Sequence, residues 1–185
     1  IEFVAAPARH FSGRGFTRNN TLWSSWVLKS ENSTIYFSGD SGYGEHFKEI
    51  GDKYGPFDFA MMECGQYNEQ WPQIHMTPEE SILASIDLQA NLMMPIHWGS
   101  FKLALHAWND PIIRVTKKAA ELNVQISTPK LGEAIIAQDE NRAYWYARFV
   151  LKAPFKFGEQ VIAKSERNSK KYAQHVLKSD FYIDG

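Results

Sequence analysis

Three side chains that can bind metal ions lie just after short apolar stretches of the sequence. They are His10, Asp40 and His97, and each is followed by a loop that contains glycine or tryptophan. The β-branched and aromatic residues before them are typical of strands, so all three residues are expected at strand ends, where they could converge. Two imidazoles and a carboxylate suit zinc or a similar divalent cation, and a carboxylate can bridge two cations.

Each of these residues also has an ordinary structural explanation. Gly39 and Gly42 bracket Asp40, so this carboxylate could simply close an Asx turn against its own backbone. A lone histidine in a loop is more often structural than ligating. The occurrence of three such residues at equivalent strand ends favours the metal-binding interpretation.

Strands and helices alternate between about residues 34 and 137, which predicts an α/β layer architecture. The expected strands are residues 1–6, 22–29, 35–37, 57–62, 92–96 and 133–137, and the expected helices are residues 44–54, a helix that starts after residue 77, and residues 110–122. Past Gln138 the composition changes, and residues 159–178 could form an amphipathic helix. We have no functional interpretation of this tail.

The helix that follows Thr77 carries the clearest start signal in the chain. Thr77 is predicted to be its N-cap, Pro78 occupies the first helical position, and Glu80 completes a capping box. The apolar faces of this helix and of the helix over 110–122 are predicted to include Ile82, Leu83 and Ile86 in the first, and Ile113, Ala120 and Leu122 in the second.

The composition limits the classes of partner. The chain has 185 residues, with 20 Lys and Arg against 21 Asp and Glu, so no net charge points to nucleic acid. No apolar run approaches the roughly 20 residues of a membrane span. The single cysteine, Cys64, fits a reducing compartment, which predicts the cytoplasm. The oligomeric state stays open.

Five short motifs occur in order within the first 101 residues. They are residues 7–15 (PARHFSGRG), 21–26 (TLWSSW), 36–43 (YFSGDSGY), 75–80 (HMTPEE) and 95–101 (PIHWGSF). Together they resemble the metallo-β-lactamase-fold hydrolases of the N-acylphosphatidylethanolamine phospholipase D-like branch, and the lactonases that open ascorbate phosphate are similar at a greater distance. The resemblance covers about residues 2–137. It implies an αββα sandwich with two metal ions, usually zinc, between the edges of two sheets.

The resemblance also implies a role for four residues. His10 matches the third histidine of the first metal site, Asp40 the bridging carboxylate, and His97 the histidine of the second site. His75 matches a further active-site histidine that acts on substrate or in proton transfer, although it could also be a surface histidine before a helix. The catalytic residues implied are therefore His75 and Asp40, and the metal ligands are His10, Asp40 and His97.

A loop over residues 65–71 would, by the same resemblance, wall the substrate cleft. Its aromatic residues Tyr67 and Trp71 could equally be ordinary surface side chains.

The chain departs from the family in one large respect. The most diagnostic motif, His-x-His-x-Asp-His, supplies most of the metal ligands, and it occurs nowhere in this sequence. Residues 1–138 therefore correspond to the second half of the domain, one sheet with its flanking helices, and residues 139–185 form a tail of unknown role. A single sheet would leave one apolar face exposed.

These features predict a metal-dependent hydrolase that uses a metal-activated water. The expected substrate is a small-molecule or lipid-like phosphodiester, with a lactone or other ester as the second choice, and no nucleic-acid partner is expected. The alternative, from a different class, is a truncated or degenerate half-domain without catalysis. Because the ligand set is incomplete, residues 1–185 alone are expected to be inactive.

Overall fold

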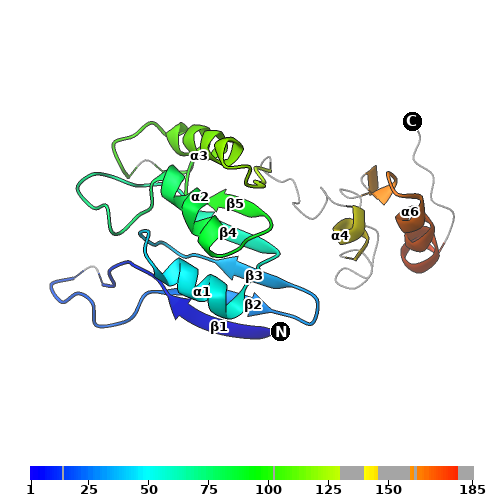
Figure 1. Ribbon diagram of the computed structural model, residues 1–185, viewed down its shortest axis with the longest axis horizontal. Helices are drawn as coiled ribbons and strands as arrows, with labels where there is room; N and C mark the ends of the chain where they lie inside the picture. Colours follow the sequence, from blue (N-terminus) through cyan, green and yellow to red (C-terminus); the bar gives the residue numbers. More distant parts are fainter. Residues whose placement is uncertain (14, 102, 130–139, 146–158, 161, 179–185) are drawn as a thin grey trace. The chain divides into compact units, whose positions relative to one another are not determined.

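The computed structural model describes residues 1–13, 15–101, 103–129, 140–145, 159–160 and 162–178. The chain forms two compact units, Ile1–Thr128 and Pro129–Gly185 (Figure 1). The expected strand over 133–137 and the expected domain boundary after residue 138 both lie outside the described residues.

The first unit is built on one five-stranded sheet. Its strands are β1 (Glu2–Pro7), β2 (Ser24–Lys29), β3 (Thr34–Phe37), β4 (Phe59–Glu63) and β5 (Met93–Ile96), and they lie in this order across the sheet. The β1–β2 and β2–β3 pairs are antiparallel, whereas β3–β4 and β4–β5 are parallel. Four strands, all except β2, therefore run in the same direction and end at the same edge of the sheet.

Three helices cover one face of this sheet (Figure 1). The helix α1 (His46–Tyr54) connects β3 to β4, α2 (Pro78–Asp87) connects β4 to β5, and α3 (Asp110–Glu121) follows β5. Parallel strands require crossover connections of this kind, and the helices bury the sheet face that they cross. The prediction of an α/β architecture with one sheet and flanking helices is confirmed.

The core lies between the sheet and the helix layer. Alternate strand residues point toward the helices because successive side chains of a strand face opposite sides. The fully buried side chains include Val27, Tyr36, Met62 and Met93 from the strands, and Phe47, Ile82 and Val115 from the three helices.

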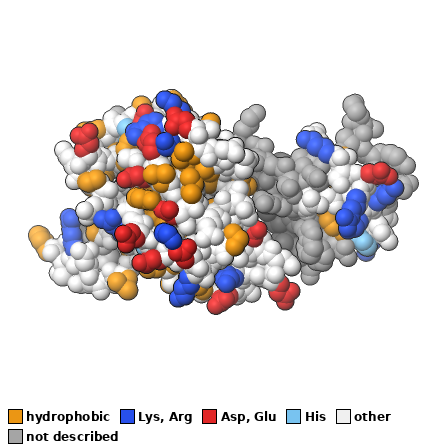
Figure 2. All heavy atoms as spheres, in the orientation of Figure 1, with side chains coloured by type: hydrophobic (Ala, Val, Ile, Leu, Met, Phe, Trp, Pro, Cys, Tyr) orange, Lys and Arg blue, Asp and Glu red, His pale blue; other side chains and the backbone are white. Residues whose placement is uncertain are grey.

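The predicted apolar faces of α2 and α3 are wrong in part. In α2, Leu83 and Ile86 are 39% and 46% exposed. All three residues predicted for the apolar face of α3 are exposed, namely Ile113, Ala120 and Leu122, and α3 buries Pro111, Val115 and Ala119 instead. The reason in α2 is a polar contact: Ser81 donates its hydroxyl to the Glu63 carbonyl at 2.5 Å, which holds a face of small residues against β4. Ile82 is buried on the same face, whereas Leu83 and Ile86 are turned outward. Figure 2 shows apolar side chains exposed among charged ones on this side of the molecule.

The opposite face of the sheet is apolar and open. Its strand residues surround a shallow hollow of about 400 Å³ that is lined by Phe3, Trp26, Leu28, Phe37 and Met61. Strand pairing aligns them, since Phe3 lies opposite Leu28 and Trp26 opposite Phe37. Within the described residues of Ile1–Thr128 this face is open: Phe3 is 62% exposed and Trp26 is 39% exposed. An exposed apolar face was expected of a single sheet.

The second unit contains short helices. They are α4 (Glu140–Trp145), α6 (Glu166–Tyr172) and a continuing π-helix η3 (Ala173–Leu177). The single helix expected over 159–178 is wrong, because Ser165 caps a new helix by accepting a hydrogen bond from the Asn168 N–H at 3.3 Å. Within the described part of the chain, no helix is both long and apolar enough to cross a membrane.

The start of α2 gives a test of local stability. The predicted capping box is confirmed: Thr77 Oγ1 accepts from the Glu80 N–H at 3.3 Å, and Glu80 Oε2 accepts from the Thr77 N–H at 2.8 Å. Replacing Thr77 by Ala should cost about 1 kcal/mol of unfolding free energy through the lost N-cap. Thr77→Ser, which keeps the hydroxyl, is the matched control, and chemical denaturation measures both. Equal midpoints for the wild type and Thr77→Ala would show that the cap does not contribute.

Candidate metal centre

The four residues singled out in the sequence surround one hollow at the carboxyl edge of the sheet. His10, Asp40, His75 and His97 line a space of about 430 Å³. The other described lining residues are Phe11, Gly13, Arg18, Trp23 and Leu103. The structure therefore brings the candidates together, while their roles in metal binding and catalysis stay predictions.

Asp40 reaches the hollow through a tight turn after β3. Gly39 has φ +59°, a conformation that residues with a Cβ rarely adopt, and a Cβ at Gly39 would approach the Ser24 carbonyl to 3.0 Å. The chain can therefore reverse beside β2 and place Asp40 at the sheet edge. Half-exposed, its carboxylate is open to the hollow.

His10 is held beside this turn by backbone contacts. The Gly42 N–H donates to the Arg9 carbonyl at 2.9 Å, and the Arg9 N–H donates to the Ser41 hydroxyl at 2.9 Å. The His10 ring stacks on Trp23 with ring centroids 4.6 Å apart. The segment after β1 is thereby fastened to the segment after β3, which explains why His10 and Asp40 line the same hollow.

His97 directly follows β5, and its backbone adopts the left-handed conformation, with φ +63°. This conformation is uncommon for a residue with a Cβ and often marks functional positions. The neighbouring Gly65 makes it possible, because a Cβ at Gly65 would lie 2.1 Å from the His97 carbonyl oxygen. The turn directs the ring back to the edge, where His97 Nε2 lies 3.7 Å from Asp40 Oδ1.

His75 enters the hollow from the loop that precedes α2. Its ring centroid is 5.2 Å from that of His10 and 5.4 Å from that of His97. The side chain is largely buried, and its Nδ1 lies 2.7 Å from Glu63 Oε1. The interpretation of His75 as a free surface histidine is therefore wrong.

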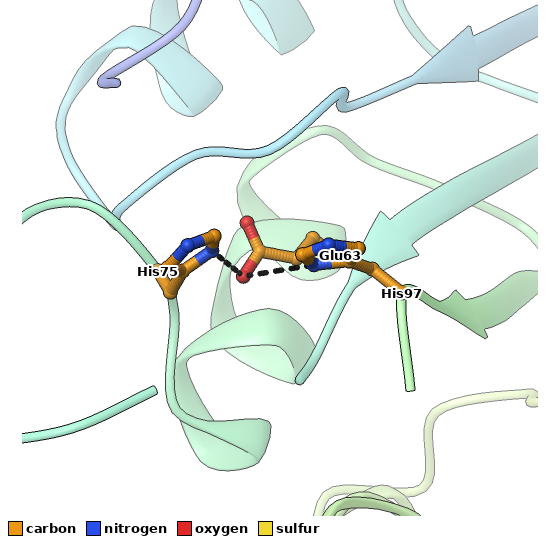
Figure 3. Close-up of side chains that lie close together, drawn as sticks. All are labelled: Glu63, His75 and His97. Carbon is orange, nitrogen blue, oxygen red and sulfur yellow. Dashed lines mark hydrogen bonds and ion pairs between the residues drawn. The ribbon is translucent and has the colours of Figure 1, made fainter. Parts of the chain in front are cut away.

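Glu63 is the member of the cluster that sequence reasoning missed (Figure 3). It is the last residue of β4 and is fully buried. Its Oε2 accepts from the Ser41 N–H at 2.5 Å, and its Oε1 faces Nδ1 of His75 at 2.7 Å and Nδ1 of His97 at 3.9 Å. The expected strand ended at residue 62, which assigned Glu63 to the loop. Its position at the end of an apolar run, like that of Asp40, was the available signal.

The two carboxylates change the acid–base behaviour of His97. Glu63 raises the pKa of His97 above its ordinary value, partial burial opposes that shift, and the charge of Asp40 adds to it. Negative charge at this edge therefore favours a positively charged group beside His97, whether a proton or a bound cation.

The predicted loop wall is not borne out by the described residues that line the hollow. Tyr67 is buried and donates its hydroxyl to the Asp110 carboxylate, while Trp71 Nε1 donates to the Gln66 carbonyl at 2.8 Å. Both side chains therefore hold the loop against the fold. His106 stacks on Tyr67, with centroids 4.2 Å apart, and is not among the described lining residues.

The donor set fits a divalent cation. Two ligands bound about 2.1 Å from a tetrahedral zinc lie about 3.4 Å apart, close to the 3.7 Å between His97 Nε2 and Asp40 Oδ1. Imidazole nitrogen and carboxylate oxygen are both ligands that zinc accepts. Glu63, His75 and His97 also offer ligand atoms that all lie within 4.8 Å of one another.

Comparison with known families agrees with this geometry. The model of the β-lactamase superfamily domain matches residues 1–98. The chain belongs to this superfamily. The resemblance drawn from the five motifs is thus confirmed.

Curated relatives place the chain in the phospholipase D-like branch of the superfamily. An uncharacterized protein of Mycobacterium tuberculosis is 43% identical over 138 residues, which cover 73% of this chain and 37% of that protein. The outer membrane protein RomA of Klebsiella pneumoniae is 56% identical over 93 residues, 50% of this chain and 70% of that protein. The N-acyl-phosphatidylethanolamine-hydrolyzing phospholipase D 1 of Caenorhabditis elegans is 38% identical over 107 residues, 56% of this chain and 30% of that protein.

This superfamily chain spans little more than a third of the length of the mycobacterial relative. Among solved structures, the metallo hydrolase Igni18 of Ignicoccus hospitalis superposes with a TM-score of 0.53 at 18% identity, covering 69% of this chain and 49% of that chain. At this identity the likeness shows the shared fold alone.

His46, at the start of α1 beside the centre, gives a pH test. Burial first, and then the charge of Arg9, lowers the pKa of His46 to about 4. The imidazole of an unfolded histidine has a pKa of about 6.5. As the pH falls from 6.5 toward 4, His46 therefore takes up a proton in the unfolded chain but stays neutral in the folded chain. Stability should therefore fall over this window, and His46→Gln should make the fall less steep.

Chemical denaturation at several pH values between 7 and 4 measures this difference. His106→Gln is the control, because it removes a histidine elsewhere in the unit. If the wild type and His46→Gln lose stability in parallel, His46 does not remain neutral in the folded chain over this pH range.

Proposed function

We propose that this chain carries the second half of a zinc-dependent hydrolase site that acts on phosphodiesters. The observation that carries the proposal is the convergence of His10, Asp40 and His97 on one hollow at the sheet edge. Membership of the β-lactamase superfamily, and the metal-dependent hydrolase of Listeria welshimeri among the relatives, at 35% identity over 77 residues, support the metal requirement.

The positions of the residues suggest separate roles in metal binding and in proton transfer. Zinc, when bound, would supply an acidified water and polarise the oxygen of the substrate. Asp40 and His97 would hold one ion, and His10 would hold a second ion that shares Asp40. His75 has Nδ1 engaged by Glu63, which leaves Nε2 to hold or transfer a proton at the leaving group.

The surroundings of the hollow support an anionic substrate. Besides the three histidines, Arg18 is the only basic residue among the described residues that line it, and its guanidinium lies 5.4 Å from the Phe11 ring centroid. An arginine suits phosphate better than a neutral lactone, since its planar donors match phosphate oxygens. The nematode relative hydrolyses N-acyl-phosphatidylethanolamine, which is a phosphodiester. A lactone or other ester is the second candidate.

A different class of function is a half-domain that does not catalyse. Three predicted ligands divide between two sites, with Asp40 shared, so neither site has the three protein ligands that catalytic zinc normally has. A site with too few ligands binds its metal weakly and leaves the hollow open to water. Both functions predict weak zinc binding and no turnover for the isolated chain. They differ for the chain combined with a complementary half, where only the first predicts turnover.

The isolated chain should bind zinc weakly and show no phosphodiesterase or lactonase turnover. Zinc titration and a generic phosphodiester assay on residues 1–185 test this expectation. An upstream segment that bears His-x-His-x-Asp-His, fused or supplied in trans, should restore tight binding and turnover. His97→Ala in the combined protein is the control that should abolish both gains.

Two outcomes would contradict this proposal. Stoichiometric binding of two zinc ions with turnover by residues 1–185 would mean that the ligand set is complete without a second segment. Tight zinc binding in the combined protein without hydrolysis of any phosphodiester or lactone would favour the non-catalytic alternative.

The substrate class can be tested through Arg18. Diethyl phosphate, titrated into the chain, should shift the indole NMR resonance of Trp23, and Arg18→Gln should weaken this binding about two- to fivefold, since an exposed charge pair contributes up to about 1 kcal/mol. Arg18→Lys should recover part of the affinity, and Lys48→Gln on α1 should have no effect. Equal affinity of the wild type and Arg18→Gln, or preference for a neutral lactone, would favour the second candidate.

A further inference from the structure

Three histidines of the centre share one pattern of contacts. His10 Nδ1 lies 2.8 Å from the carbonyl oxygen of Phe11, and Nδ1 of His75 lies 2.7 Å from Glu63 Oε1. His97 Nδ1 lies 3.9 Å from the same Oε1. Carbonyl and carboxylate oxygens only accept hydrogen bonds, so the contacts of His10 and His75 favour a proton on Nδ1. For His97 the distance is too long for a hydrogen bond, and the negative charge of Glu63 on that side of the ring favours a proton on Nδ1 electrostatically. The Nε2 atom of each neutral ring then keeps its lone pair.

Figure 3 shows that one carboxylate serves two of these rings. The position of Glu63 is fixed from several sides. Its N–H donates to the Ser38 hydroxyl at 2.9 Å, and its carbonyl accepts from the Ser81 hydroxyl at 2.5 Å. Its other carboxylate oxygen accepts from the Ser41 N–H. A side chain with so many restraints, fully buried, presents Oε1 at a defined point between the two rings.

We propose that Glu63 is a positioning residue that orients both His75 and His97 and holds their protons on Nδ1. The proposal rests on the proposed function, because it makes one buried carboxylate set the tautomer of an expected metal ligand and of an expected proton-transfer group. In His97 the ring is then turned so that Nε2 faces Asp40 at 3.7 Å. In His75 the lone pair of Nε2 is available at the hollow.

The physical reason for this role is the hydrogen bond that a metal-binding histidine makes through its non-ligating nitrogen. A histidine that binds a metal through one nitrogen normally donates its other N–H to a carboxylate or carbonyl, which fixes the ring and raises its basicity. Glu63 supplies this contact for His97 and a shorter one for His75. Since both contacts end on one oxygen atom, a change at Glu63 alters both rings together, whereas His10 keeps its own backbone acceptor.

The alternative is that Glu63 itself is a ligand, with a cation held between its Oε1 and the two Nδ1 atoms. One ligand atom from each of Glu63, His75 and His97 lies within 4.8 Å of the other two, which permits such a site. The two arrangements differ at Nδ1. A positioning role requires a proton there in the metal-free and in the zinc-bound chain, whereas a ligand role requires that zinc replace it.

The test uses ¹⁵N-histidine NMR of residues 1–185, first without metal, near pH 9, above the ordinary histidine pKa of about 6.5. We expect the wild-type chain to show the Nδ1–H tautomer for His75 and His97. Glu63→Gln should raise the population with the proton on Nε2 in both rings and leave His10 unchanged. Glu79→Gln, which alters an acid paired with Arg114 elsewhere, is the matched control.

Zinc is then added to the same samples. Zinc affinity should fall about 10- to 100-fold in Glu63→Gln and stay constant in Glu79→Gln. The Nδ1 protons of His75 and His97 should persist in the zinc-bound wild type.

Three results would overturn the proposal. They are a wild-type His75 with its proton on Nε2, tautomers that Glu63→Gln leaves unchanged, and loss of the Nδ1 protons on zinc binding. The wild-type tautomer decides the point even if Glu63→Gln does not fold. None of these measurements depends on turnover, so a chain that fails every hydrolase assay can still confirm or refute the role of Glu63.

Discussion

The shared direction of β1, β3, β4 and β5 is the constraint on which the candidate site depends. Because these strands end at one edge, residues far apart in the sequence lie close together there, and no long loop is needed to bring them together. Each strand end contributes one polar group to the edge: His10, Asp40, Glu63 and His97 in chain order. Only His75 comes from a loop, and the capped start of α2 fixes the end of that loop.

Burial of Glu63 gives this arrangement its rigidity. A carboxylate taken out of water costs several kcal/mol unless hydrogen bonds replace its hydration. Here Ser41 and His75 supply them at 2.5 Å and 2.7 Å, and both come from segments that line the edge. The fold can keep this charge buried only if these segments stay in place, so the site geometry and the stability of the edge depend on the same contacts.

Sequence reasoning succeeded where interactions are local or follow from a strand end. The capping box of Thr77 depends on residues three positions apart, and Asp40 stands beside the glycine that its turn requires. Glu63 was not predicted as a site residue because its hydrogen-bond partners lie 22 and 12 positions away in the sequence. Only the tertiary fold shows whether an acid at a strand end points inward. Leu83 was wrongly placed in the core because a single hydroxyl contact of Ser81 sets the rotation of α2.

The open apolar face and the metal centre are physically linked through β2. Trp26 belongs to the apolar face, whereas Trp23, just before the strand begins, stacks on His10 at the edge. A second layer packed on that face would end beside the hollow and exclude water from it, and charges interact more strongly where the effective dielectric constant is lower. Under the proposed function, this second layer would also supply the missing metal ligands. Burial of the apolar face and completion of the metal site are therefore expected to occur together, as one cooperative step.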